Sequence, residues 1–246
     1  MEKTKKVIQK YWDWRSTSFG HDADKSAAIA SQWESIVTQW AGAASGRCAL
    51  DIGTGTGQFA VYLARAGFSV TGIDISPAMV TRARQYAAEQ QCAIDFQTGD
   101  AEALAFDDHQ FDVVVSRNCL WTLPHPDRAL SEWRRVLKPG GHLMVCDGLW
   151  KNTTWMRTHR LAYKLIKDLG VNGSRVSLRF FRAYAGIYKR LPFYEGLRLD
   201  AAVKLLQNAR FKNIQPYDTS RLQVCPYPAK RTNQAPPPFF IAAATR

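Results

Sequence analysis

The segment Ala49-Leu50-Asp51-Ile52-Gly53-Thr54-Gly55-Thr56-Gly57 decides the fold of this chain of 246 residues. Its first four residues are typical of the end of a buried parallel strand, and residues 59–64 have the periodicity of a helix. Glycines at every second position allow a sharp turn and bring backbone amides against a ligand, where a Cβ atom would collide. The segment therefore predicts a strand–loop–helix unit that cradles a ligand.

A second short strand pattern, residues 69–74, also ends in an acid. Asp74 follows Gly57 at about the spacing at which an acidic residue accepts hydrogen bonds from both hydroxyls of a ribose. The alternative is that Asp74 caps the helix expected to begin near Pro77, a role that Ser76 would fill equally well. We expect Asp74 to bind a ligand, because two such features occur on consecutive strands.

The spacing of the glycines excludes two related loops. A phosphate-binding P-loop needs a lysine after its last glycine, and Gln58 stands there instead. A dinucleotide-binding loop presses its amides and helix dipole onto a pyrophosphate. Asp51, two residues before the first glycine, would repel a pyrophosphate but suits a ligand that carries an ammonium group.

These residues resemble the first two motifs of class I S-adenosylmethionine-dependent methyltransferases, and three later segments agree. Residues 99–104 resemble the stretch after the third strand, where an acid accepts a hydrogen bond from the adenine amino group. Residues 111–116 resemble the fourth strand, and residues 137–145 resemble the turn into the fifth. The resemblance extends over about residues 48–147 and is closest to the small-molecule, type 11-like branch. It says almost nothing about the methyl acceptor.

The resemblance implies a Rossmann-like α/β fold, with a doubly wound, seven-stranded, mostly parallel sheet and an antiparallel edge strand. Alternating strand and helix patterns by themselves predict a parallel sheet with right-handed crossovers and a site at the carboxyl ends of its strands. The strands are expected near residues 49–52, 69–73, 93–98, 113–116, 142–146, 213–217 and 239–244, and the last helix at 199–208.

The length fits a single domain, which we divide into four parts. Residues 1–44 are expected to form an N-terminal helical lid and residues 45–150 the cofactor-binding core. Residues 151–198 are expected to form a helical lid insertion after the fifth strand. Residues 199–246 complete the domain with the last helix and the edge hairpin.

The resemblance also implies that an aromatic residue and an arginine of the N-terminal helix face the cofactor. Tyr11, Arg15 and Phe19 are spaced to share one helical face, and Arg15 is expected to pair with the cofactor's carboxylate. The alternative is a surface ion pair between Arg15 and Asp13, which contributes little. Taken together, the candidates for binding S-adenosylmethionine, or the product S-adenosylhomocysteine, are Arg15, Asp51, Gly53, Gly55, Gly57, Asp74, Ile75, Met79, Asp100, Ala101, Glu102 and Arg117.

Methyl transfer from a sulfonium is an in-line displacement on an activated carbon, so catalysis rests mainly on positioning and desolvation. A base is needed only when the nucleophile arrives protonated, and Tyr11 and His125 are the candidates, although an exposed loop residue is the preferred interpretation of His125. Trp121 is a candidate acceptor wall or a core residue. The other acceptor candidates are Arg160, Arg179 and Tyr184, and no spacing of cysteine or histidine indicates a metal.

Positive charge is concentrated after the fifth strand. The net charge is +12, and residues 151–198 hold eleven basic and two acidic side chains, which predicts an anionic partner. We therefore expect a small anionic metabolite to be methylated on oxygen, nitrogen or sulfur. The alternatives are an RNA methyltransferase that uses the basic insertion, a quinone or lipid acceptor at an anionic membrane surface, and a non-catalytic regulator that binds S-adenosylmethionine.

The remaining features favour a cytoplasmic protein, monomeric or homodimeric, without integral membrane contact. No run approaches the roughly 18 apolar residues of a membrane helix, and the N-terminus does not read as a secretion signal. The five cysteines have no paired spacing, so free thiols are expected.

Overall fold

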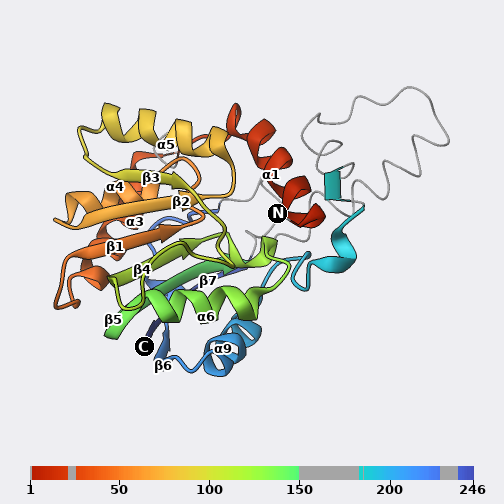
Figure 1. Cartoon of the computed structure of the whole chain (residues 1–246). Coiled ribbons are helices and arrows are strands. Elements are labelled where there is room, and N and C mark those ends of the chain that lie inside the picture. The colour runs from red at the N-terminus through yellow and green to blue at the C-terminus, as the bar shows by residue number, and fades with distance from the viewer. Residues whose placement is uncertain (1, 22–25, 150–182, 185, 228–237) are drawn as a thin grey trace.

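A seven-stranded sheet of order β3-β2-β1-β4-β5-β7-β6 forms the centre of the computed structural model (Figure 1), which describes residues 2–21, 26–149, 183–184, 186–227 and 238–246. The strands are β1 (Cys48–Ile52), β2 (Ser69–Asp74), β3 (Asp95–Thr98), β4 (Phe111–Arg117), β5 (Leu137–Gly148), β6 (Lys212–Pro216) and β7 (Phe239–Thr245). The helices are α1 (Lys3–Ser16), α3 (Ala27–Ala41), α4 (Gln58–Arg65), α5 (Pro77–Glu89), α6 (Pro126–Val136) and α9 (Leu199–Asn208), with 3-10 turns at Leu120–Thr122, Tyr188–Arg190 and Thr219–Arg221.

The pairing of the strands confirms the predicted Rossmann-like fold. Strands β1 to β5 are parallel to one another, and β7 is antiparallel to both of its neighbours, β5 and β6. The antiparallel strand is therefore β7, one place inside the edge that β6 forms. Strand β5 begins at Leu137, earlier than the expected residue 142, because Leu137 already pairs with Phe111 of β4.

Both faces of the sheet are buried, as the apolar strand patterns require. In β4, Val114 packs into one hydrophobic cluster with α6 and α9, while Val113 and Val115 pack into a second cluster with α3, α4 and α5 (Figure 1). Successive side chains of a strand point to opposite faces, so every central strand supplies both clusters. Polar side chains then have room to meet only at the ends of the strands.

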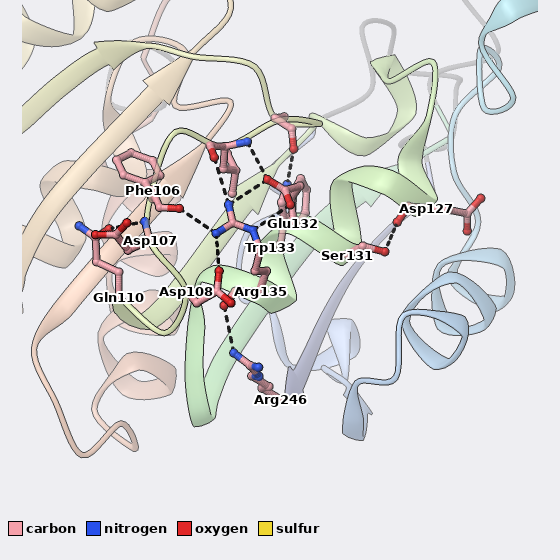
Figure 2. Close-up of polar contacts among 12 residues, drawn as sticks. Phe106, Asp107, Asp108, Gln110, Asp127, Ser131, Glu132, Trp133, Arg135 and Arg246 are labelled. Atoms are coloured by element: carbon pink, nitrogen blue, oxygen red, sulfur yellow. Dashed lines mark hydrogen bonds and ion pairs between the residues drawn. The ribbon is translucent and has the colours of Figure 1, made fainter.

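The connection between β3 and β4 is fixed to α6 by a polar network (Figure 2). Arg135 lies at its centre and donates to the carbonyl oxygens of Leu104 (3.0 Å) and Phe106 (2.8 Å). Glu132 accepts from the backbone amide of Leu104 at 3.0 Å, and its ion pair with Arg135 lowers the pKa of its carboxyl. The fully buried Trp133 donates from Nε1 to the carbonyl oxygen of Ala101 at 2.9 Å. These bonds fix the backbone that begins at the carboxyl end of β3.

The helices among the described residues are all too short or too polar to span a bilayer. The predicted division into four parts stays a prediction, because residues 150–182, most of the expected insertion, lie outside the described residues.

Replacing Trp133 by Phe tests how firmly this network holds the loop. The variant keeps an aromatic ring but removes the Nε1 donor and leaves the Ala101 carbonyl without it, so we expect a loss of about 1–3 kcal/mol in the free energy of unfolding. Trp33→Phe is the matched control, since Trp33 is also fully buried and its Nε1 has no hydrogen-bond partner within the described residues. Urea denaturation measures both variants, and equal losses would contradict the role given to the bond.

Candidate functional site

A cavity of about 1020 Å³, its open mouth included, lies at the carboxyl ends of β1, β2 and β4. It is the crevice at which an open α/β sheet binds its ligands. Helix α1 contributes one wall, with Lys5, Ile8 and Trp12, and Phe19 lies beyond the end of that helix. The other lining residues come from the end of β1, the loop after it and the start of α4, from the end of β2 and the start of α5, and from residues 99–101, 117–119 and 122–124.

The first two glycines of the opening segment line the cavity. Gly53 has φ +69°, and a Cβ atom there would lie 2.7 Å from Sγ of Cys119, so no side chain fits. Gly55 faces open space, which leaves its backbone accessible to a ligand. Gly57 does not line the cavity: it has φ +85°, precedes α4 and packs against Ala83 and Phe96. Its role in this structure is to turn the chain into the helix.

Asp51 and Asp74 present two buried carboxylates to the cavity. Asp51 is 2% exposed, and its Oδ2 accepts from Thr54 Oγ1 (2.7 Å) and from the amide of Ala60 (3.1 Å). Asp74 accepts from the amides of Gly55 and Ser76, each at 2.9 Å. The cap of α5 is Ser76, whose Oγ accepts from the amide of Met79. Asp74 therefore does not cap α5, and its bond from the amide of Gly55 connects the glycine loop to β2.

Burial raises the pKa of both carboxyls. Desolvation is the largest cause for each and places the pKa of Asp51 and that of Asp74 at about 6. The bonds from Thr54 and the backbone amides lower these values only in part. A ligand with an ammonium group and vicinal hydroxyls would stabilise the two ionised carboxylates, because it would supply the charge and donors that water no longer supplies.

A second group of charges lies where the cavity reaches the end of β3. Asp100 Oδ1 accepts from the amide of Glu102 at 2.9 Å, and Oδ2 accepts from Lys5 Nζ at 2.7 Å. Glu102 is fully buried behind the cavity, where its carboxylate lies 2.6 Å from Lys5 Nζ and accepts from the amide of His125. Glu102 therefore does not line the cavity, and its predicted contact with the cofactor stays a prediction. Lys5 was not among the predicted site residues, although its spacing of three and seven residues from Ile8 and Trp12 could have indicated a shared face.

Arg117 lies at the end of β4, as expected, and lines the cavity. Its guanidinium donates to Gln58 Oε1 at 3.1 Å and lies over the rings of Phe59 and Trp33. Stacking and the hydrogen bond hold it in place. The predicted residues Ile75, Met79 and Ala101 also line the cavity.

The face of α1 that lines the cavity is not the predicted one. The helix ends at Ser16, so Arg15 and Phe19 do not share a helical face. Arg15 donates to Ser18 Oγ, lies over the Phe19 ring and does not line the cavity. Asp13, its alternative partner, instead accepts from Ser76 Oγ at 2.6 Å. Asp13 is thus not the partner of Arg15 here, and the predicted contact of Arg15 with the cofactor's carboxylate stays a prediction.

Most of the candidate catalytic and acceptor residues do not line the cavity. Tyr11 and Tyr184 pack edge to face in a separate cluster, where burial raises the pKa of Tyr11 to about 12. The His125 ring is half exposed and 3.5 Å from the Glu2 carboxylate. Trp121 is buried and donates from Nε1 to the carbonyl of Asn118. Arg160 and Arg179 lie outside the described residues.

The described residues that line the cavity include no imidazole, and burial raises the pKa of the Cys119 thiol, so the thiol is neutral at physiological pH. Over the described ranges, no group of three or more histidine, cysteine, aspartate or glutamate side chains could hold a metal ion. The geometry thus offers carboxylates, backbone groups and an apolar wall. It is suited to binding and orienting a ligand rather than to moving protons.

Comparison with known proteins gives consistent matches. A family model described as a methyltransferase domain matches residues 50–145. The ubiquinone/menaquinone biosynthesis C-methyltransferase UbiE of Roseobacter denitrificans is 30% identical over 197 residues, 77% of this chain and 78% of that protein. A ubiquinone biosynthesis O-methyltransferase of Coxiella burnetii is 36% identical over 98 residues, 40% of this chain and 42% of that protein. Phosphoethanolamine N-methyltransferase 2 of Haemonchus contortus, solved with S-adenosyl-L-methionine, shares the fold (TM-score 0.59, 17% identity, 96% of this chain and 60% of that chain).

The raised pKa of Asp51 predicts a stability gain when its charge is removed. Folding raises this pKa from 3.8 to about 6, so the folded protein binds the proton more tightly and loses stability as the pH rises through about 6. Asp51→Asn should therefore be more stable than the wild type by about 1–3 kcal/mol at pH 8. The gain should shrink toward pH 4.5. Urea denaturation across this range measures it, with the exposed Asp95→Asn as control, and a gain that does not depend on pH would contradict the assignment.

Proposed function

The chain belongs to the class I S-adenosylmethionine-dependent methyltransferases, and we propose that it methylates a small acceptor that combines an apolar ring with an anionic or ionisable group. One observation carries the proposal: the buried carboxylates of Asp51 and Asp74 share a single cavity with the apolar side chains of α1 and its continuation. One side of the cavity is thus polar and suited to the methyl donor. The other side is aromatic and apolar.

The proposed donor contacts follow from the residues that line the polar side. Asp51 binds the ammonium group of the methionine moiety, and Asp74 accepts from the ribose hydroxyls. Asp100 and the amide of Ala101 bind the edge of the adenine, while Ile75 and Met79 pack against its faces. Bound S-adenosylmethionine supplies a methyl group already activated by the positive sulfur.

The chain's own residues then orient the acceptor and exclude water. Ile8, Trp12, Phe19 and Leu123 form an apolar wall toward which an acceptor ring can pack. Fixing two reactants in the productive geometry lowers the activation free energy by up to roughly 7–11 kcal/mol. A reaction of this kind needs no metal cluster or triad.

The absence of an imidazole among the described lining residues constrains the acceptor. The neutral Cys119 thiol is a poor base, and Asp51 and Asp74 face the donor. The acceptor must therefore bring a nucleophile that is already ionised or readily ionised, such as the oxygen of an acidic phenol or an electron-rich ring carbon beside it. Oxygen, nitrogen and sulfur acceptors fit this requirement, and the UbiE relative, a C-methyltransferase by name, adds carbon.

The basic residues support the anionic part of the proposal. Residues 151–198 hold eleven basic and two acidic side chains. The basic residues of this segment that the structure describes are exposed: Lys189, Arg190 and Arg198. A positive field near the acceptor side favours the approach of an anion.

Calorimetry with S-adenosylhomocysteine tests the donor assignment. We expect one binding site in the wild type and at least tenfold weaker binding in Asp74→Ala, because two ligand hydroxyls lose their acceptor. Affinity should also fall below about pH 6, where Asp51 and Asp74 become protonated. The exposed Asp95→Ala is the matched control, and unchanged affinity in Asp74→Ala would refute the contact.

Transfer of a labelled methyl group tests the acceptor class. The purified protein, given labelled S-adenosylmethionine, should methylate hydroxybenzoate- or quinol-type rings in preference to RNA. His125→Ala should keep its turnover within about twofold, because the ring lies outside the cavity. Labelled RNA with salt-sensitive binding would favour the RNA alternative. Intact S-adenosylhomocysteine binding with no labelled product from a metabolite extract would favour a regulator.

A further inference from the structure

The ammonium group of Lys5 occupies an unexpected position, between the cavity and a buried carboxylate. We propose that Lys5 is a positioning residue for the cofactor: it orients Asp100 at the adenine end of the cavity and fastens α1 over the bound molecule. This inference rests on the proposed contact between Asp100 and adenine. We call the two ion pairs of Lys5, with Asp100 and with Glu102, the latch, because they connect α1 to the residues after β3.

The contacts of Lys5 are short and enclosed. Its Nζ lies 2.7 Å from Asp100 Oδ2 and 2.6 Å from Glu102 Oε2. The Lys5 side chain is 9% exposed, that of Glu102 is 0% exposed, and that of Asp100 is 31% exposed. Lys5 and Asp100 both line the cavity, whereas Glu102 lies behind them. One cation therefore links a fully buried acid to an acid that still faces the ligand space.

The burial of Glu102 makes this link hard to release. If Lys5 moved away, Glu102 would keep the hydrogen bond from the amide of His125 but would be a buried charge with no counter-ion among the described residues. Leaving one member of such a pair unpaired is costly, so the amino-terminal turn of α1 stays against residues 100–102. An exposed lysine on the same helix would exert no such hold.

The other end of α1 is anchored as well. Asp13 Oδ1 accepts from Ser76 Oγ at 2.6 Å, and Arg82 donates to the carbonyl of Ser16 at 2.8 Å. These contacts lie beside Asp74, at the proposed ribose site, whereas Lys5 lies at the proposed adenine site. Helix α1 thus spans the cavity from one cofactor-binding acid to the other, and Figure 1 shows it across the carboxyl edge of the sheet.

The same contacts fix the orientation of Asp100. The amide of Glu102 holds Oδ1 and Lys5 holds Oδ2, so the carboxylate cannot rotate freely. An adenine amino group then meets an acceptor that is already oriented. Departure of the cofactor requires the Lys5 end of α1 to lift, which makes the break of this ion pair part of the release step.

Stopped-flow measurement of S-adenosylhomocysteine dissociation tests the latch, with the change in tryptophan fluorescence, to which Trp12 in the cavity wall contributes, as the signal. We expect Lys5→Met to raise the dissociation rate constant tenfold to a hundredfold and to change the association rate constant by less than about threefold. Lys5→Arg should restore slow dissociation to within about fivefold of the wild type. The control is Lys6→Met, which changes an exposed lysine on the same helix.

The double variant Lys5→Met/Glu102→Gln separates the latch from a loss of stability. It removes both members of the buried pair, so it should recover thermal stability lost in Lys5→Met while dissociation stays fast. Dissociation at the wild-type rate in Lys5→Met would refute the latch and leave the proposed function intact. Tighter binding in Lys5→Met would also refute it, because Lys5 would then be blocking the site. A wild type that does not bind S-adenosylhomocysteine would defeat both the latch and the proposed function.

Discussion

Two buried carboxylates, at the ends of neighbouring parallel strands, are the constraint on which the rest of the site depends. Asp51 and Asp74 emerge at the same edge because β1 and β2 run parallel and in register. Neither has enough hydrogen bonds to compensate for burial, so the ordinary ionised state of each is disfavoured. Under the proposed function, the same two groups bind the cofactor, which supplies the charge and the donors that burial removes. The glycine at position 55 meets a requirement of the same site, because its amide donates to Asp74 while the lack of a side chain leaves room for a ligand.

The sheet and the position of Asp51 and Asp74 in the wall of the cavity were predictable because local patterns determine them. Apolar runs that end in Asp51 and Asp74 identify the strands, and the carboxyl edge of a parallel sheet brings the two acids together without further information. Asp100 and Ala101 follow by the same rule from the end of β3. The early start of β5 was not predictable, since it depends on the pairing of Leu137 with Phe111 rather than on the composition of the turn.

The N-terminal helix shows where such patterns stop being informative. Aromatic residues lie on several faces of α1, so periodicity alone could not tell which of them line the cavity. Tyr11 packs on Tyr184 and does not line the cavity, whereas Trp12 lines the cavity and also packs against the same cluster. Arg15 seemed the natural cation for the site, but the helix ends one residue later and its guanidinium turns to Ser18. Lys5 looked like one of four lysines in a polar N-terminus, and only tertiary contacts distinguish it.

The small cluster of Ile8, Tyr11, Tyr184, Ile187 and Leu191 has an evolutionary consequence. It packs α1, which lines the cavity, against a segment that follows the basic stretch of the chain, whereas the network around Arg135 ties the backbone of Leu104 and Phe106 to α6. Sequence drift that adapts the enzyme to a new acceptor can leave the Arg135 network untouched. It cannot alter Tyr184, Ile187 or Leu191 without compensating changes in α1, so these two distant segments should covary as one unit of selection.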